Sequence, residues 1–405
     1  MLDLLSVLKN NLCMFKKKYF LTGLTVFVLL QLFFYSFLMV FYQKVPFNQY
    51  LYDTGFHYID DNRTQNGSFN IINALSAWDG QWYLRIADAG YTTKAEVDSH
   101  QGEKFLDKFA YAFLPLYPAL VSITDIPIHN IQISAFILSN SILLAIFFST
   151  YYVVTKLFSR EVAMRTNFLL LFFPLGIFYR SYYAESLFLL LLIWFGYFLI
   201  KRKWWFVGML LALLMLTKPN GTFLMVPLFL VLLQEVRKKK IAIWRAAGIF
   251  LFPLVTYVYL YVTSKIYMDD GWYWLSAHSY WGPKSPVLQT INSNLQTIWR
   301  FSSLPWHVYK SSKSEIIGFF IGLYLLFKSR KMPHPELWYI SLSLLLIPLL
   351  IKSFTSYARY EMVAFPLFIY LATKLKSWWY EVFISISFVL FLYISLVFIN
   401  WGWVE

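Results

Sequence analysis

The sequence predicts an all-α polytopic membrane protein, and three observations lead to this fold class. Of its 405 residues, 59% are hydrophobic and only 14% are charged, whereas a soluble domain carries about 25% charged residues. Apolar stretches of roughly 17 to 25 residues recur along the chain, each long enough to cross a hydrocarbon core of about 30 Å. Short clusters of basic residues separate these stretches. We therefore expect a single membrane domain over residues 1–405.

The basic clusters set the expected orientation of the chain. The formal net charge is +14, which in a soluble protein would suggest a nucleic-acid partner. Here the basic residues lie between apolar stretches, as they do in the cytoplasmic loops of membrane proteins. The clusters lie at residues 16–18, 156–165, 201–203, 237–240, 328–331 and 374–376. We therefore expect the lipid bilayer, and no nucleic acid, as a partner, and a cytoplasmic N-terminus.

The first predicted span, residues 19–41, is too long for the apolar core of a signal peptide and lacks a clear cleavage site, so we expect it to be retained. The polar stretch that follows, residues 43–130, is expected to form the first extracytoplasmic loop, with interfacial helices. Its segment 105–124 contains Pro115 and Pro118, and a crossing there would place the basic cluster at 156–165 outside. An interfacial or re-entrant helix is expected there, with a spanning helix as the alternative.

The remaining spans are expected at residues 131–157, 163–179, 183–200, 204–216, 222–236, 241–263, 315–327, 337–351, 360–375 and 380–398. With the first they make about eleven transmembrane helices. A second extracytoplasmic loop is expected at residues 264–314. The segment 204–216 is short and leads into the motif Thr217-Lys218-Pro219-Asn220-Gly221. Because Pro and Gly open a helix, we expect this motif to line a protein cavity at membrane depth.

Asp79 is the first candidate for catalysis. A helical stripe of apolar residues surrounds it and suits a helix lying in the membrane interface; its members are Ile71, Leu75, Trp78, Trp82 and Ile86. Asp79 lies on the flank of this stripe between Trp78 and Trp82, where it would be partly shielded from water. A shielded carboxylate suits a general base. The alternative is a surface carboxylate that pairs with Arg85 or Lys94.

Three further charged residues begin or end predicted helices on the same side. Glu185 is an ionisable residue at the mouth of a membrane helix, which is a functional candidate, although it could simply cap the helix. Arg359 could grip a phosphate with its planar fork of donors, or it could snorkel to the interface. Lys218 could bind the same anion as a point charge. We also place Tyr183, Asn220, Tyr360 and His278 among the substrate-binding candidates, although a lone loop histidine is more often an ordinary surface residue.

Several features are missing from the sequence. It has no Gly-rich phosphate loop and no nucleotide-binding βαβ pattern, so a soluble nucleotide sugar is not expected as a substrate. The single cysteine, Cys13, allows no disulfide within the chain, and His, Asp and Glu are not grouped with metal-ligand spacing. We therefore expect no cofactor and no metal site, with a divalent metal left open. A donor linked to a lipid phosphate, entering from the bilayer, fits the residues that are present.

The motifs resemble those of the GT-C superfamily, the polytopic glycosyltransferases that use polyprenyl-phosphate sugars. More narrowly, the chain resembles the family of the GPI mannosyltransferase that adds the second mannose, with its prokaryotic relatives. The matching motifs occur in the family's order: Trp78-Asp79-Gly80 followed by Ile86-Ala87-Asp88-Ala89-Gly90-Tyr91, Ala112-Phe113-Leu114-Pro115-Leu116-Tyr117-Pro118, Tyr183-Ala184-Glu185-Ser186-Leu187-Phe188, Thr217-Lys218-Pro219-Asn220-Gly221, and Ser356-Tyr357-Ala358-Arg359-Tyr360 with Phe365-Pro366.

The resemblance implies a GT-C-like fold and an inverting sugar transfer in which Asp79 is the catalytic base. It also implies a polyprenyl- or dolichyl-phosphate mannose donor, and an active site formed by the first outer loop and the turn that holds Glu185. The chain has Lys218-Pro219 where the family has an Arg-Ser-like pair, which leaves the acceptor open among a glycan, a glycolipid and a protein. The abundance of Lys, Phe, Tyr and Ile suggests a prokaryote, and hence the plasma membrane.

Two other function classes fit part of the pattern. A transporter or flippase for a lipid-linked sugar would also place charges and broken helices at membrane depth. It predicts two pseudo-symmetric halves with interruptions at matching places, and the sequence shows no such repeat. A non-catalytic lipid-binding membrane protein predicts binding of the lipid-linked sugar without release of the lipid phosphate.

Overall fold

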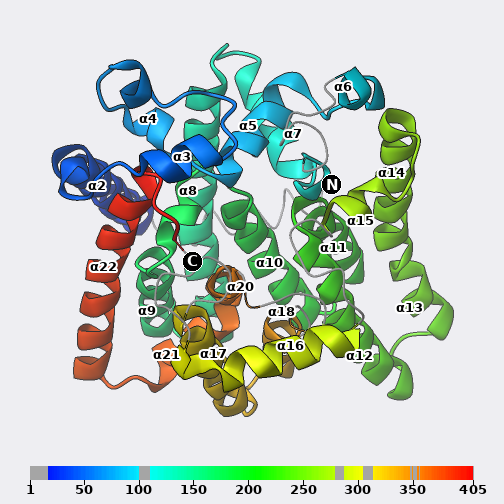
Figure 1. Cartoon of the computed structure of the whole chain (residues 1–405). Helices are drawn as coiled ribbons and strands as arrows, with labels where there is room; N and C mark the ends of the chain where they lie inside the picture. The colour runs from blue at the N-terminus through cyan, green and yellow to red at the C-terminus, as the bar shows by residue number, and fades with distance from the viewer. Residues whose placement is uncertain are drawn as a thin grey trace.

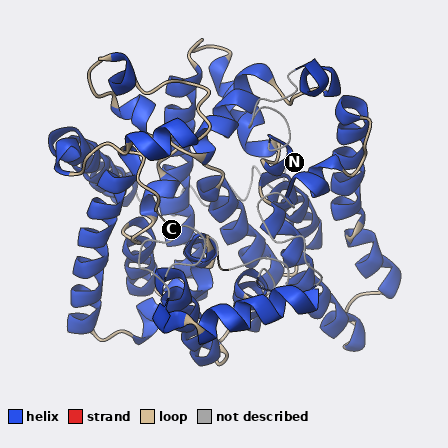
Figure 2. Ribbon diagram, in the orientation of Figure 1, coloured by secondary structure: helices blue, strands red, loops and turns tan. Residues whose placement is uncertain are grey.

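The computed structural model describes residues 17–99, 110–278, 287–303, 313–346, 349, 354 and 356–404. Every regular element in these ranges is helical (Figure 2). Five stretches are long and apolar enough to cross a membrane, namely Phe20–Lys44, Ile131–Leu157, Pro219–Arg237, Ile243–Met268 and Ser377–Ile399. Shorter apolar helices accompany them, so the chain is a polytopic membrane protein, as its composition predicts.

The long stretches correspond to labelled helices in Figure 1. They are α2 (Lys17–Phe41), α8 (Ile131–Leu157), α12 (Met225–Arg237) after the 3₁₀ turn η5 (Pro219–Leu224), α13 (Ile243–Ile249) with α14 (Leu251–Met268), and α22 (Ser377–Ile399). The predicted helix 241–263 is therefore two helices that meet at Phe250. Pro253, which cannot donate a backbone hydrogen bond to the preceding turn, accounts for this break.

Shorter helices accompany the long ones. They are α9 (Arg160–Leu171), α10 (Glu185–Ile200), α11 (Trp204–Thr217), α17 (Lys313–Ser329), α18 (Pro335–Leu345), α20 (Tyr357–Val363) and α21 (Phe365–Lys374). Two predicted helices were drawn too long. The helix predicted to end at residue 179 ends at Leu171, shortly before Pro174, and the segment 360–375 is divided at Ala364, just before Pro366. Both breaks follow from the proline, which has no backbone N–H to donate to the preceding turn and whose ring clashes with the carbonyl four residues before it.

The segment predicted as the first outer loop forms a layer of short helices at one end of the molecule, uppermost in Figure 1. Its helices are α3 (Gln49–Thr54), α4 (Ile71–Ala74), α5 (Asp79–Ala89), α6 (Lys94–Ser99) and α7 (Leu116–Asp125). With 10 residues, α7 is about 15 Å long, too short to cross a bilayer. The expected single stripe from residue 71 to 86 is interrupted, because α4 ends at Ala74 and α5 begins only at Asp79.

The segment predicted as the second outer loop contributes α15 (Tyr273–His278) and α16 (Val287–Trp299). Tyr273 of α15 packs edge-on against Tyr111 of the turn η3 (Ala110–Ala112), with ring centroids 5.1 Å apart. Helix α16 lies toward the opposite end of the molecule, near the bottom of Figure 1, and Asn294 donates a hydrogen bond of 2.9 Å to the carbonyl of Leu349. The side of the membrane on which this segment lies stays a prediction.

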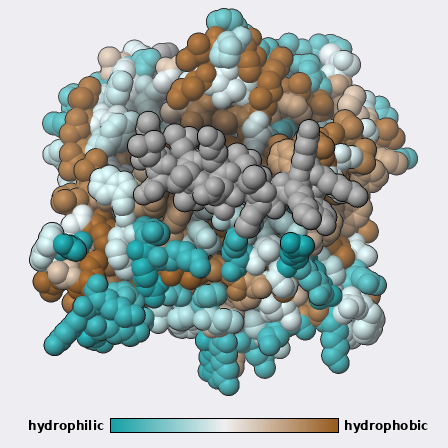
Figure 3. Space-filling model, turned by 180° about the vertical axis from the view of Figure 1, so that it is seen from behind, coloured by the Kyte–Doolittle hydropathy of each residue, from teal (hydrophilic) through white to brown (hydrophobic). Residues whose placement is uncertain are grey.

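The surface matches a membrane environment. Large apolar side chains are exposed on α2, α14 and α22, among them Leu29, Val255 and Val389 at 59%, 66% and 65% exposure. Seen from behind, hydrophilic side chains gather along the lower edge (Figure 3). That is the end at which α12 and α21 terminate in Figure 1, followed by the basic residues 237–240 and 374–376.

Candidate active site

Four charged side chains from distant parts of the chain meet in one ionic cluster. Arg359 of α20 donates from Nη1 to Asp79 Oδ2 at 3.0 Å, and from Nε and Nη2 to Glu185 Oε1 at 2.9 and 2.5 Å. Lys218, at the end of α11, donates to the same Glu185 oxygen at 2.6 Å. We call Asp79, Glu185, Lys218 and Arg359 the Arg359 cluster. Its formal charges, two positive and two negative, balance.

Glu185 is the buried centre of this cluster. It is fully buried, whereas Lys218 and Arg359 are 12% and 13% exposed and Asp79 is 22% exposed. The apolar run that follows makes α10 a membrane helix, and Glu185 in its first turn faces the positive end of the helix dipole. All three bonds from the two cations go to Oε1. Oε2 is buried and has no hydrogen-bond partner among the described residues, so it is available to a hydroxyl.

The two cations are held by different local structures. Arg359 packs its guanidinium over the rings of Phe178 and Tyr183, with Cζ 4.9 and 5.2 Å from the ring centroids. This arrangement fixes the plane of the donor fork. Lys218 follows α11 in extended backbone, directly before Pro219 opens the 3₁₀ turn η5. The predicted helix break at residues 217–221 therefore exists, and it brings the Lys218 ammonium to Glu185.

Tyr183 joins the backbone before Asp79 to the rest of the cluster. Its hydroxyl accepts a hydrogen bond from the Asp79 backbone N–H at 3.0 Å and donates one to the Ala77 carbonyl at 3.0 Å. Burial, with the carboxylates of Glu185 and Asp79 nearby, raises the pKa of the neighbouring Tyr83 well above its ordinary range. Tyr83 therefore contributes a neutral phenol beside the cluster.

Trp78, directly before Asp79, has an unusual backbone conformation. Its φ of 61° with ψ of −123° lies in a region that glycine prefers and a bulky side chain avoids. Such a conformation costs on the order of 1–3 kcal/mol and persists only where the surroundings hold it. The indole of Trp78 lies against Trp401 and Trp403, with ring centroids 5.4 and 4.8 Å away. The chain thus turns sharply to begin α5 with Asp79 facing Arg359.

The other predicted site residues lie at different distances from the chemistry. Trp82 is buried and stacks on Phe56 at 3.7 Å between ring centroids, so it packs in the core beside the site. Tyr360 is 6% exposed and packs edge-on against Tyr357. Asn220 is buried, and its Nδ2 has no partner among the described residues. His278 ends α15, and its side chain lies outside the described part of the structure.

Sequence reasoning did not single out Phe178, Trp401 or Trp403. Phe178 is one of many aromatic residues in a chain that is 21% aromatic, and only its position under Arg359 distinguishes it. Trp401 and Trp403 follow a membrane helix, where interfacial tryptophans are common. The repeat of tryptophan on either side of Gly402 is the feature that could have drawn attention to them.

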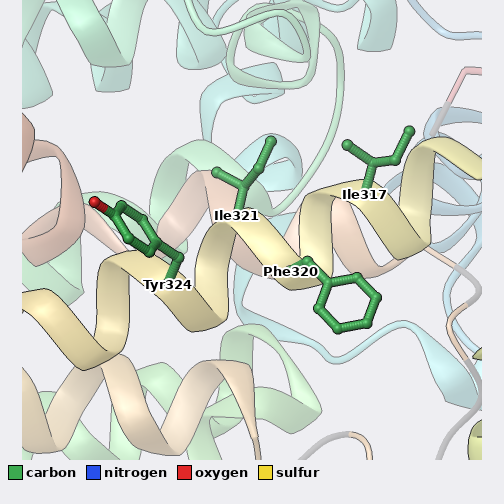
Figure 4. Close-up of a pocket in the computed structure, with 4 residues that line it drawn as sticks. All are labelled: Ile317, Phe320, Ile321 and Tyr324. Carbon is green, nitrogen blue, oxygen red and sulfur yellow. The ribbon is translucent and has the colours of Figure 1, made fainter.

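A cavity among the described residues lies away from the Arg359 cluster. The cavity in Figure 4 is lined by Ile317, Phe320, Ile321 and Tyr324 on one face of α17. It includes no member of the Arg359 cluster and no charged side chain. No group of three or more His, Cys, Asp and Glu side chains that could hold a metal ion occurs in the ranges that the structure describes.

The fold and this cluster define an integral membrane protein in which two cations and two carboxylates meet around a buried glutamate. Residues 11–263 match the family model described as Mannosyltransferase (PIG-V). The match spans more than half of the chain, which therefore belongs to this mannosyltransferase family, as its motifs predicted, and is a glycosyltransferase. No curated protein and no solved structure matches the chain. Asp79, Glu185 and Lys218 lie within the matched residues, whereas Arg359 joins them through the fold.

Proposed function

We propose that this mannosyltransferase moves mannose, with inversion, from a polyprenyl- or dolichyl-phosphate carrier to an acceptor hydroxyl at the extracytoplasmic face. The observation that carries the proposal is the contact of Arg359 with both Asp79 and Glu185. It joins the proposed proton acceptor to the cation that we propose binds the phosphate. We further propose a GT-C-like arrangement of about eleven transmembrane helices, with the short apolar helices completing the five long stretches.

In the proposed reaction, Asp79 takes the proton from the acceptor hydroxyl. The acceptor oxygen then forms a bond to the anomeric carbon of mannose from the face opposite the phosphate. The bond from that carbon to the phosphate oxygen breaks, and its electron pair leaves with the lipid phosphate. Arg359, with Lys218 and Tyr360 nearby, stabilises the negative charge that develops on the departing phosphate.

Glu185 has two proposed roles. Through Oε1 it holds Arg359 and Lys218 side by side, so that two donors face one anion. Through Oε2 it orients a hydroxyl of the sugar or the acceptor. The unpartnered Nδ2 of Asn220 offers a further donor to the same substrate. Trp78, Trp82, Tyr183 and His278 complete the proposed substrate-binding set.

The sidedness of the site is also a proposal. The helices α3 to α7, with Asp79 among them, gather at the end opposite the basic residues that follow α12 and α21 (Figure 1). Because basic loops remain on the cytoplasmic side, this separation favours an extracytoplasmic site. In a prokaryote the protein would lie in the plasma membrane, with its N-terminus in the cytoplasm.

The test is to incubate purified protein with polyprenyl-phosphate [³H]mannose and a lipid extract of the source cells, and to measure mannosylated product and free lipid phosphate together. The proposal predicts equal amounts of both. Labelled product without free polyprenyl phosphate would exclude this donor chemistry. Binding without either product would support a non-catalytic role towards this lipid, and passage of the intact donor across a vesicle membrane would support a flippase.

A further inference from the structure

The segment that follows α22 lies against the residue before Asp79, although more than 300 residues separate them in the chain. The Gly402 carbonyl accepts a hydrogen bond of 3.3 Å from Trp78 Nε1. The Trp78 ring is tilted 49° to Trp401 and stands nearly perpendicular, at 89°, to Trp403. The Trp78 side chain therefore receives three contacts from the segment Asn400–Trp403, and the backbone of Trp78 is strained.

Several hydrogen bonds hold the segment Asn400–Trp403 in place, so that its contacts can fix the position of Trp78. Asn400 donates to the carbonyl of Tyr42 at 2.8 Å and accepts from Arg63 Nη1 at 2.5 Å. Its carbonyl accepts from the Asn48 N–H at 2.9 Å. Arg63 also donates to the carbonyl of Ile399 at 2.7 Å. The first outer segment thus binds the end of α22 on several sides.

Aromatic packing also holds the segment Asn400–Trp403 in place. Trp401 is 1% exposed and has a left-handed backbone, with φ of 59°. Its ring packs edge-on against Tyr52, with centroids 4.9 Å apart. Gly402 has no room for a side chain, because an added Cβ would lie 2.3 Å from Val397 Cγ1 and 2.9 Å from the Val397 carbonyl oxygen. The path of residues 400–403 is therefore determined by packing as well as by hydrogen bonds.

We infer that Asn400–Trp403 is a positioning element of the active site, which holds Trp78 in its strained conformation and so directs the Asp79 carboxylate toward the acceptor. The inference rests on the proposed role of Asp79. These residues contact neither substrate nor the reacting atoms in this account, and they act through Trp78. A small displacement of a catalytic group can cost about 10²-fold in rate, so contacts to Trp78, directly before Asp79, can control turnover.

The experiment compares Trp403→Ala with Trp403→Phe, which keeps an aromatic ring against Trp78, and with Gly402→Ala, which displaces the segment by another route. The matched control is Trp379→Ala, an exposed tryptophan at the other end of α22. Activity is measured with polyprenyl-phosphate [³H]mannose and the lipid extract. Hydrogen exchange is measured on the peptide of residues 76–84.

We expect Trp403→Ala and Gly402→Ala to lower kcat about tenfold with little change in the KM for the donor. Both should also speed hydrogen exchange in that peptide. Trp403→Phe and Trp379→Ala should stay near the parent in both measurements.

A second background separates this inference from the proposed function. Asp79→Glu already misplaces the carboxylate, so Trp403→Ala should cost less than twofold when added to it. An equal tenfold loss in both backgrounds, or unchanged exchange and unchanged kcat in both Trp403→Ala and Gly402→Ala, overturns the positioning role and leaves the proposed function standing. If Asp79→Asn alone retains full turnover, the proposed role of Asp79 fails, whatever the effect of the Gly402 and Trp403 variants.

Discussion

Two ion-pair networks among the described residues, the Arg359 cluster and a second one centred on Arg202, differ in what surrounds them. In the second group Arg202, in the turn between α10 and α11, pairs with Glu235 of α12 at 3.1 Å and with Glu336 of α18 at 2.7 Å. It also donates to the carbonyl of Leu199 at 2.7 Å. We call these three charged residues the Arg202 cluster. It ties the ends of three helices together near the basic residues 201–203 and 237–240.

The Arg359 cluster uses its charges differently. Arg202 is 31% exposed and bonds its two carboxylates through separate nitrogens, which suits a structural clasp near water. In the Arg359 cluster the cations converge on one fully buried oxygen of Glu185, and the other oxygen is left without a partner among the described residues. Buried charge with unused hydrogen-bonding capacity suits a ligand site, because an unpaired buried group is costly until a ligand fills it.

The largest expected effect separates Asp79 from its neighbours on α5. Asp79→Asn removes the proposed base while keeping the size of the side chain, and should lower turnover by about 10² to 10⁴. Asp88→Asn, on the same helix but bonded to Tyr58, should leave turnover near the parent. Both proteins should elute from size exclusion and melt like the parent. Equal turnover in the two variants would contradict the role of Asp79.

Arg359→Gln is expected to have the next largest effect, because it removes the cation proposed to face the leaving phosphate. Loss of one such donor typically costs about 10² to 10³ in kcat. It also leaves the buried Glu185 with Lys218 alone, and breaking a buried pair can cost about 3–5 kcal/mol. We therefore expect both a lower kcat and a lower thermal midpoint, measured in the same detergent preparation. A variant that melts early but turns over normally would make Arg359 purely structural.

Glu185→Gln should have a smaller effect, since the amide oxygen can still accept bonds from Arg359 and Lys218. Hydrogen bonds to charged groups contribute about 1.5–3 kcal/mol, so kcat/KM should fall roughly 10- to 100-fold. If Glu185 orients the two cations proposed to bind phosphate, the fall in kcat/KM should be found when the concentration of the sugar donor is varied. An unchanged donor titration, with a fall confined to the acceptor titration, would restrict Glu185 to the acceptor.

Arg202→Gln is expected to change catalysis least. It should lower the thermal midpoint, because Glu235 and Glu336 are buried and would lose the cation that they share. Leaving a buried polar group without its partner costs about 1–3 kcal/mol. The kcat should stay within about twofold of the parent, because Arg202 bonds to Glu235, Glu336 and Leu199 and not to the Arg359 cluster, and changes at separate sites act independently. A tenfold loss of kcat with an unchanged melting curve would show that the comparison between the two clusters is wrong.

The sequence was sufficient for the fold class and for the individual members of the Arg359 cluster. Apolar runs identify membrane helices directly, and the charges of Asp79, Glu185, Lys218 and Arg359 are conspicuous beside such runs. Helix ends were harder to predict, because Pro174 and Pro366 lie within apolar runs that by themselves suggest continuous helices. In both places the proline determined where the helix broke.

The contacts within the site could not be predicted from local patterns. Arg359 is 174 residues from Glu185 and 280 from Asp79, and no periodicity relates positions so far apart. The strained backbone of Trp78 could not be predicted either, because the sequence suggested a continuous helix. In the structure Trp78 packs against Trp401 and Trp403, and the Tyr183 hydroxyl bonds to the backbone on both sides of it. The motifs pointed to the candidate residues, and the fold determined which of them touch.

The most direct measurement of the central claim is where the donor's phosphate binds. A polyprenyl-phosphate mannose analogue with a photoreactive group on the isoprene unit next to the phosphate would be crosslinked to the purified protein and the labelled peptides sequenced by mass spectrometry. The account predicts labels near Arg359, Lys218 and Tyr183, which unlabelled polyprenyl-phosphate mannose removes and Arg359→Gln weakens. Competable labelling beside Arg202 and Glu336, with none near Arg359, would contradict it.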